Sequence, residues 1–319
     1  MISIGLAIPA LIAGVLFLYK GSDILINGTA KTAVQLGVSS LIISLIIVAF
    51  GTSAPEFAIS VGAAAQRDAD ISLGNIIGSC VANLLLILGI GAIIKPIKIQ
   101  EKIIKREMPI LLVLTLLFLI ISFFGFLDHI YYHWIGGIIL LVLFGLFVVY
   151  FIKCAKKERV VNKKYTAGKT SRNILFILLG IIGVVVGAYL LIESTKVIAD
   201  FFNIPKFVIA ISIVAVGTSL PELVVSVMAI YKNEADIAIG NVLGSNVFNI
   251  YLVLGVSALF IPLNAVASLD HLLFLMLVTV VTFPILYTGQ LISRKEGAFM
   301  LVLYSVFIWY TFFGYKLFF

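Results

Sequence analysis

The sequence predicts an all-α integral membrane protein with ten transmembrane helices in two inverted five-helix repeats. Three observations lead to this fold class. First, the 319 residues are 62% hydrophobic and only 12% charged, whereas soluble proteins carry about 25% charged residues. Second, a stretch of 39 residues occurs twice. Third, the apolar segments are long enough for helices that cross a hydrocarbon layer about 30 Å thick.

The duplicated stretch places oxygen-bearing side chains in apolar surroundings. Residues 51–89 and 217–255 align without a gap at an offset of 166 (217 − 51), and 20 of the 39 positions are identical. The shared positions include Gly-Thr-Ser-x-Pro-Glu, followed by Gly-Asn-x-x-Gly-Ser-x-x-x-Asn. A match of this length indicates a duplicated half-protein.

Taken in order, the apolar segments predict five helices in each half of the chain. They lie near residues 3–20, 37–65, 71–94, 108–127 and 133–153, and then near 173–193, 206–231, 237–261, 271–290 and 296–315. The first repeat therefore covers residues 1–153 with the duplicated region 37–94, and the second covers 173–319 with 203–260. Because five is odd, the second copy enters the membrane from the opposite side, as in many secondary transporters.

Basic residues predict the orientation of the helices. With both termini outside the cell, the inner side receives the basic linker 154–172 and most other lysines and arginines, while the outer side keeps Arg67, Lys196, Lys206 and Lys316. We therefore expect a multi-pass protein of the cell membrane with extracellular N- and C-termini. The first apolar run, residues 2–19, lacks a preceding basic segment and a cleavage site, so it reads as a retained helix.

The same distribution bears on possible partners. The net charge of +7 comes from residues between apolar segments, so membrane orientation explains it better than nucleic-acid binding. The lipid bilayer is the expected surroundings, and we predict no obligatory protein partner. Cys80 and Cys154 lie in unrelated contexts, which supports neither a disulfide framework nor a metal cluster.

Two glutamates stand out among the fifteen acidic residues. Glu56 and Glu222 each lie well inside an apolar helix, at equivalent positions of the two copies. A carboxylate there costs several kcal/mol and is a functional-site candidate by default. Each follows a proline, Pro55 or Pro221, which removes a backbone donor and frees carbonyl oxygens nearby.

Hydroxyl and amide groups surround these glutamates at helical spacing. Residues three and four apart lie on one face of a helix, which groups each glutamate with nearby hydroxyls and pairs a serine with an asparagine in the next helix: Thr52, Ser53, Thr218, Ser219, Ser79, Asn83, Ser245 and Asn249. A set of carboxylate, hydroxyl, amide and carbonyl oxygens suits a hard cation such as Ca²⁺. Asn75 and Asn241 fit packing and ligand roles equally well.

These motifs resemble the two repeats of the calcium/cation antiporter superfamily, particularly its sodium/calcium exchanger branch of prokaryotic type. The resemblance rests on GTSAPE with GNIIGSCVAN in the first copy and GTSLPE with GNVLGSNVFN in the second. It implies an antiporter and not an enzyme, which extrudes Ca²⁺ by inward Na⁺ movement through alternating access and uses no cofactor.

The resemblance also implies roles by motif position. Glu56 and Glu222 would be central ligands shared by Ca²⁺ and Na⁺, with the threonines and serines of both GTS motifs beside them. Ser79 and Ser245 would complete flanking sodium sites, and Ala49 and Ala215 would contribute backbone carbonyls. Some relatives, including potassium-dependent ones, carry Asp where this chain has Asn83 or Asn249. With asparagine at both positions, the site has only the two formal negative charges of the glutamates, which weakens the case for K⁺ transport.

Other functions fit less well. A Ca²⁺/H⁺ exchanger of the same superfamily would use buried glutamates as proton carriers, but such relatives usually have an acidic residue in the second motif. A membrane hydrolase could use Ser53 or Ser219 as a nucleophile, yet the sequence offers no His or Lys deep in the membrane as the base. An ion channel would conduct without countertransport.

Overall fold

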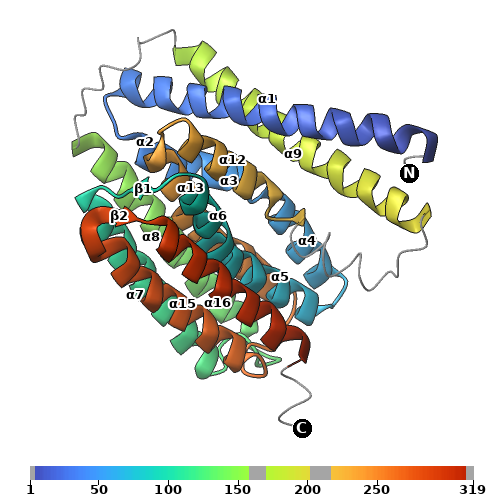
Figure 1. Cartoon of the computed structure of the whole chain (residues 1–319). Helices are drawn as coiled ribbons and strands as arrows, with labels where there is room; N and C mark the ends of the chain where they lie inside the picture. Colours follow the sequence, from blue (N-terminus) through green and yellow to red (C-terminus); the bar gives the residue numbers. More distant parts are fainter. Residues whose placement is uncertain (1–3, 158–169, 202–216, 314–319) are drawn as a thin grey trace. The chain divides into compact units, whose positions relative to one another are not determined.

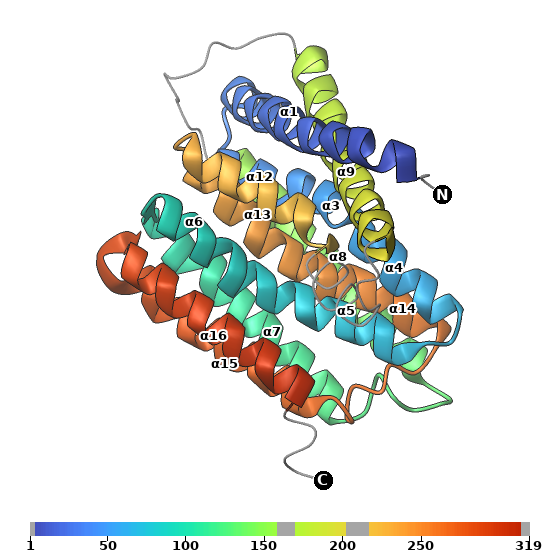
Figure 2. The same cartoon turned by 45° about the vertical axis from the view of Figure 1, so that its right-hand side comes forward.

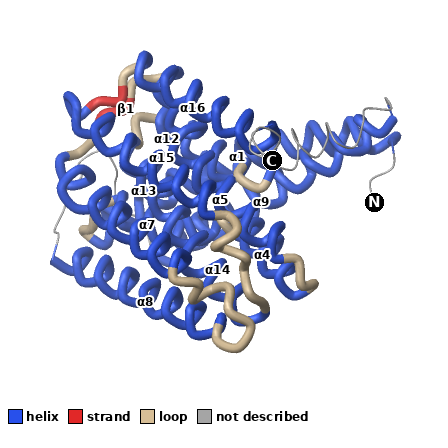
Figure 3. The backbone as a smooth tube through the Cα atoms, turned by 90° about the horizontal axis from the view of Figure 1, so that it is seen from below, coloured by secondary structure: helices blue, strands red, loops and turns tan. Residues whose placement is uncertain are grey.

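A computed structural model describes residues 4–157, 170–201 and 217–313, and their backbone is almost entirely helical (Figures 1 and 3). The first half forms α1 (Ile4–Leu36), α2 (Ser40–Ile43), α3 (Ala49–Thr52), α4 (Ala54–Ala65), α5 (Ala69–Val81), α6 (Leu88–Ile94), β1 (Ile97–Lys98), α7 (Met108–Phe123) and α8 (His133–Lys157). The second half forms α9 (Thr170–Phe201), α12 (Leu220–Tyr231), α13 (Ala235–Val247), α14 (Leu254–Phe260), α15 (Leu269–Tyr287), β2 (Leu291–Ile292) and α16 (Arg294–Phe313).

Several helices are joined end to end by π-helical turns. These turns cover Ser44–Val48, Ala82–Ile87, Ile103–Glu107 and Phe248–Val253, and a short 3-10 turn covers Thr288–Gln290. π-helical turns are rare and occur frequently at functional sites. Two of them begin three residues after the serine of each Gly-Asn-x-x-Gly-Ser motif, so the backbone departs from a regular α-helix at the same point of both copies.

The described helices confirm an α-helical membrane protein. Seven of them are long and apolar enough to cross a bilayer, and an eighth is added if the bent pair Ser40–Thr52 and Ala54–Ala65 counts as one span. Each predicted helix overlaps a helical segment; residue 3 of the first, residues 206–216 of the seventh and residues 314–315 of the tenth lie outside the described residues. Ten spans in inverted repeats remain a prediction.

The two copies share their local structure residue by residue. The bounds of α4, α5 and α6 plus 166 give those of α12, α13 and α14, and the π-helical turns 82–87 and 248–253 keep the same offset. The turn between α4 and α5 is repeated between α12 and α13, because Arg67 (φ 63°) and Asn233 (φ 65°) are equivalent and both adopt the left-handed conformation.

Two predicted helix ends were wrong. The first helix runs on to Leu36 and not to residue 20, and α9 continues to Phe201 and not to residue 193. Polar side chains within these extensions are paired: Asp23 accepts from Asn27 (3.3 Å) and forms an ion pair with Lys232, and Glu193 pairs with Lys196 at 2.9 Å. Such pairing lets charged residues continue a helix that sequence alone appears to end.

The chain packs into two units. The first contains residues 1–59 and 144–248, and the second contains residues 60–143 and 249–319. Each unit therefore combines segments from both halves of the sequence. These units describe packing, whereas the repeat boundaries at 1–153 and 173–319 describe duplication and stay a prediction.

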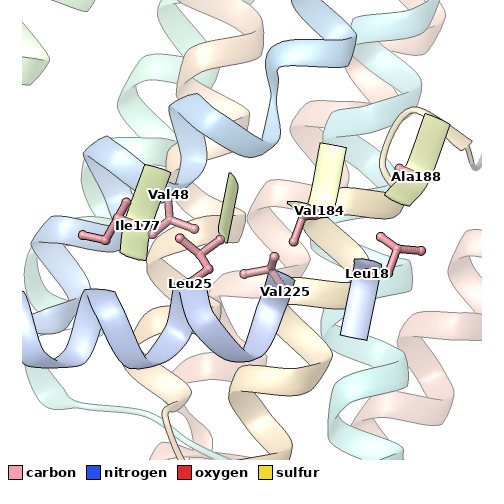
Figure 4. Packing of buried hydrophobic residues seen from close by; sticks show 7 residues of the cluster. All are labelled: Leu18, Leu25, Val48, Ile177, Val184, Ala188 and Val225. Carbon is pink, nitrogen blue, oxygen red and sulfur yellow. The ribbon is translucent and has the colours of Figure 1, made fainter. Parts of the chain in front are cut away.

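In the first unit, α1 and α9 pack against each other over a long contact; they run beside one another in Figure 1 and cross in the turned view of Figure 2. Glycines allow the close approach: a Cβ added to Gly21 would lie 2.8 Å from the backbone nitrogen of Val184. Small residues at helix contacts are the usual means of tight packing in lipid. Apolar side chains fill the rest of this interface and extend it to Val48 and Val225 (Figure 4).

In the second unit, polar contacts tie loops and helices together. The strands β1 and β2 pair antiparallel, with Ile97 opposite Ile292. The Asp128 carboxylate accepts hydrogen bonds from the backbone nitrogens of Ala265 (2.6 Å) and Val266 (2.7 Å). The buried hydroxyl of Tyr251 donates to the carbonyl oxygen of Leu114.

Candidate ion-binding site

Each intramembrane glutamate lies in the first turn of a helix, three residues after a serine with non-helical dihedral angles. The chain bends by 49° between Ser40–Thr52 and Ala54–Ala65, and Ser53 at the break has φ −79° and ψ 8°. Ser219 has nearly the same conformation, with φ −85° and ψ 9°. A proline two residues later removes a backbone donor and crowds the preceding turn, so both copies place a non-helical serine just before the helix that carries the glutamate.

The two copies exchange hydrogen bonds through these serines. Ser53 Oγ donates to Glu222 Oε1 at 2.9 Å, and Ser219 Oγ donates to Glu56 Oε1 at 3.2 Å. Ser245 Oγ on α13 adds a bond to Glu222 Oε1 at 3.3 Å. Both glutamates are fully buried. The first packing unit therefore brings two carboxylates from distant parts of the sequence into one polar cluster.

The second carboxylate oxygen of Glu222 is unsatisfied. Glu222 Oε2 is buried and has no hydrogen-bond partner among the described residues. The partners of Oε1 are neutral hydroxyls, which do not balance a charge. A buried carboxylate oxygen without a donor is costly, and a bound cation satisfies both its charge and its lone pairs.

Asn241 is a member of the cluster that sequence reasoning did not resolve. Its Oδ1 accepts from Thr52 Oγ1 at 3.0 Å, while its Nδ2 donates to Ser226 Oγ at 3.0 Å and to the Glu222 carbonyl oxygen at 3.4 Å. These bonds join α3, α12 and α13. The amide thus holds the backbone that carries Glu222.

The equivalent residue in the first copy makes an equivalent bond. In the second packing unit, Asn75 Nδ2 donates to Ser60 Oγ at 2.9 Å, and the pair Asn75 and Ser60 corresponds to Asn241 and Ser226 at the offset of 166. The signal in the sequence was the repetition of both residue types at a fixed separation of 15. Without the structure, that separation did not distinguish a bridge between helices from a ligand.

Close backbone contact supports the cluster. A Cβ on Gly244 would lie 2.7 Å from the Cβ of Ala49, and Ser44 Oγ donates to the carbonyl oxygen of Ile237 at 2.6 Å. These contacts confirm that the glycine pair Gly240 and Gly244 permits close helix approach. No described atom lies within 4 Å of a Cβ added to Gly74 or Gly78.

The remaining predicted ligands are distributed as follows. Thr218 lies buried beside Ser219, and the Ala49 carbonyl oxygen accepts from Ser53 N at 3.0 Å and Thr52 Oγ1 at 3.3 Å. Ala215 lies outside the described residues. The second unit contains Ser79, Asn83 and Asn249, all buried.

Asn83 and Asn249 lie in the two π-helical turns that follow the serine motifs. Neither amide atom of Asn249 has a hydrogen-bond partner among the described residues, although the side chain is fully buried. Buried amides normally find partners. An unsatisfied oxygen at a π-helical turn fits a place for a ligand.

Comparison with known proteins decides the family. The family model described as sodium/calcium exchanger protein matches residues 6–153 and 172–313. This chain belongs to the sodium/calcium exchanger family. The family consists of transporters and not of enzymes.

Relatives of this exchanger align along nearly its whole length. It is 33% identical to the sodium/calcium exchanger MaX1 of Methanosarcina acetivorans, over 93% of this chain and 96% of the relative. It is 34% identical to an uncharacterized membrane protein of Methanocaldococcus jannaschii, over 94% and 96%. A solved structure of the sodium-calcium exchanger NCX_Mj has a TM-score of 0.84 and 32% identity, and covers 96% of this chain and 98% of its own.

Proposed function

We propose that this exchanger extrudes Ca²⁺ from the cell by coupling it to inward Na⁺ movement, through alternating access to a central ion site. Na⁺/Ca²⁺ antiport itself follows from the family to which the chain belongs. We add to it the outward direction of Ca²⁺ transport and the alternating access. Solved structures of NCX_Mj concern extracellular ion exchange and induced binding-site occlusion, which supports the same mode of transport here.

The proposed architecture is ten helices in two inverted repeats, in the cell membrane, with both termini outside. The constant offset of 166 between α4–α6 and α12–α14 supports the duplication. The excess of lysine and arginine in the segments assigned to the inner side supports the orientation. In such transporters the ion site lies near the middle of the membrane, where the repeats meet.

The site is proposed to hold ions through Glu56 and Glu222, and one observation carries this assignment. Serines from opposite copies donate to the two glutamates, and a buried oxygen of Glu222 stays unsatisfied. Two carboxylates balance the charge of Ca²⁺, which takes six to eight oxygen ligands. The other proposed ligands are Thr52, Ser53, Thr218, Ser219, Ser79, Ser245, Asn83, Asn249 and the carbonyls of Ala49 and Ala215.

Coupling then follows from competition. Ca²⁺ and Na⁺ use overlapping ligands, so binding of one excludes the other. With no ion bound, the buried carboxylates lack compensating charge, and enclosing them in the membrane while the carrier changes sides is costly. The empty carrier therefore rarely changes sides, and one ion moves out only when the other moves in.

Transport in liposomes tests this function. The full chain is reconstituted, and Ca²⁺ uptake is followed with an outward Na⁺ gradient, an outward H⁺ gradient, or no gradient. We expect uptake with the Na⁺ gradient only, because Na⁺ leaving the vesicle drives Ca²⁺ inward. Uptake with the H⁺ gradient alone would assign the chain to Ca²⁺/H⁺ exchange, and Ca²⁺ flux without any countertransport would indicate a channel.

A further inference from the structure

An apolar groove opens on the first packing unit, and neither Glu56 nor Glu222 is among the residues that line it. Its volume is about 550 Å³, and it lies between the end of α1, the segment α2 with the π-helical turn after it, and the last turns of α8. Ile42 and Ile43 form a buried floor, whereas Leu36, Ile47 and Ile152 are exposed. The groove is thus a hollow in a surface that otherwise faces lipid.

One end of the groove is charged. Lys156 carries the charge among the described residues that line it, and it lies in the last turn of α8. Gly37 and Val38, in the turn that joins α1 to α2, also line the groove. Lys153 and Lys157 are exposed on the same last turns of α8. Lysines therefore lie at one end of the apolar groove, beside the end of a membrane-spanning helix.

The helical lining of the groove is shorter than one leaflet. From Ser40, where α2 begins, to Ile47 the helical lining advances seven residues, which is about 10 Å along a helix. Half of a hydrocarbon core of about 30 Å is about 15 Å. An acyl chain that enters at the lysines would therefore stay within one leaflet while it follows this lining.

We propose that this groove binds an anionic phospholipid, with one acyl chain in the groove and the headgroup phosphate at Lys156. Basic pockets between transmembrane helices on the cytoplasmic side suit anionic headgroups, and the sequence assigns the end of α8 to that side. A zwitterionic lipid fills the apolar part equally well but gains less from the lysines. The lysine charge therefore favours an anionic headgroup over a zwitterionic one, and the apolar groove favours a ligand with an acyl chain.

Lipid titration of the purified full-length protein tests the proposal. The protein in neutral detergent is titrated with phosphatidylglycerol, with phosphatidylcholine of the same chains, or with inorganic phosphate, and the unfolding temperature is measured. We expect phosphatidylglycerol to raise the unfolding temperature at a lower concentration than phosphatidylcholine does, because a ligand that binds the folded state stabilises that state. Phosphate alone should give no shift. Equal effects of the two lipids would indicate ordinary surrounding lipid only and overturn the proposal.

Two variants locate the site. Lys156→Gln should weaken the apparent affinity for phosphatidylglycerol about fivefold, the effect expected of one lysine near a membrane surface. Lys295→Gln, which removes an exposed lysine from the second unit, should leave it unchanged and controls for net charge. Equal affinities in the two variants would contradict the assignment.

Filling the groove provides a second, independent readout. Ile46→Trp should reduce binding of phosphatidylglycerol and of phosphatidylcholine alike, whereas Ile138→Trp on the exposed face of α8 should reduce neither. If Ile46→Trp does not fold, the lysine pair still decides. Because these measurements follow binding and not transport, a failure here leaves the proposed exchange function untouched.

Discussion

At the residue scale, the bridge made by Asn241 determines how Glu222 is held. The amide contacts Thr52, Ser226 and the backbone of Glu222 itself. Because these groups are buried, losing the amide leaves hydroxyls that must find other partners. Asn241 is therefore a positioning residue in this account, and its effect on ions passes through Glu222.

The first prediction concerns Asn241→Ala. Leaving buried polar groups unsatisfied costs about 1–3 kcal/mol, so we expect a lower unfolding temperature and a roughly tenfold higher KM for Ca²⁺. Asn173→Ala is the matched control, because Asn173 is also buried and donates to Gln35 Oε1 at 3.0 Å, but contacts no glutamate of the site in the described structure. The control should lose stability and keep its KM. An unchanged KM in Asn241→Ala would remove the positioning role.

At the element scale, the pair of long helices α1 and α9 depends on glycine for its close contact. Gly21 faces Val184 and Gly183 at distances that leave no room for a side chain. Shape complementarity replaces the hydrophobic effect as the source of association in lipid. Widening this contact affects the whole first unit, because Val48 and Val225 pack on the same cluster (Figure 4).

The second prediction is that Gly21→Val destabilises the protein by about 1–3 kcal/mol, the usual cost of overpacking. Gly145→Val is the control, since no described atom lies within 4 Å of a Cβ added to Gly145 on α8. Thermal unfolding of both variants in detergent measures the difference. A Gly21→Val protein as stable as its control would show that the helices separate easily.

At the scale of the whole molecule, the orientation in the membrane can be measured through Cys154. This free thiol is partly exposed near the end of α8, whereas Cys80 is buried. With both termini outside, Cys154 faces the cell interior. A membrane-impermeant maleimide should label it in right-side-out vesicles only after permeabilisation, with Cys154→Ser as the control for specificity. Labelling of intact vesicles would invert the proposed orientation.

The sequence predicted the family and an α-helical membrane protein, and both are confirmed. It also singled out Glu56 and Glu222, because a carboxylate in an apolar helix is rare and its repetition is rarer; their role as ion ligands stays a prediction. It did not predict the length of α1, because Lys20 and Asp23 resemble the end of a span and the stabilising Lys232 lies 209 residues away. The π-helical turns also escaped prediction, since a continuous apolar run does not reveal where the helical pitch changes. Contacts between distant segments, as at Asn241, required the fold.

The central claim is that Glu56 and Glu222 together bind the transported ions, and isosteric replacement tests it most directly. Na⁺-driven Ca²⁺ uptake is measured in liposomes with Glu56→Gln, Glu222→Gln and the control Glu193→Gln. Glu193 also lies in a membrane-spanning helix, but it pairs with Lys196. We predict that either site variant loses uptake while the control keeps it, because glutamine preserves the shape and removes the charge. Near-normal uptake in Glu56→Gln or Glu222→Gln would contradict the account.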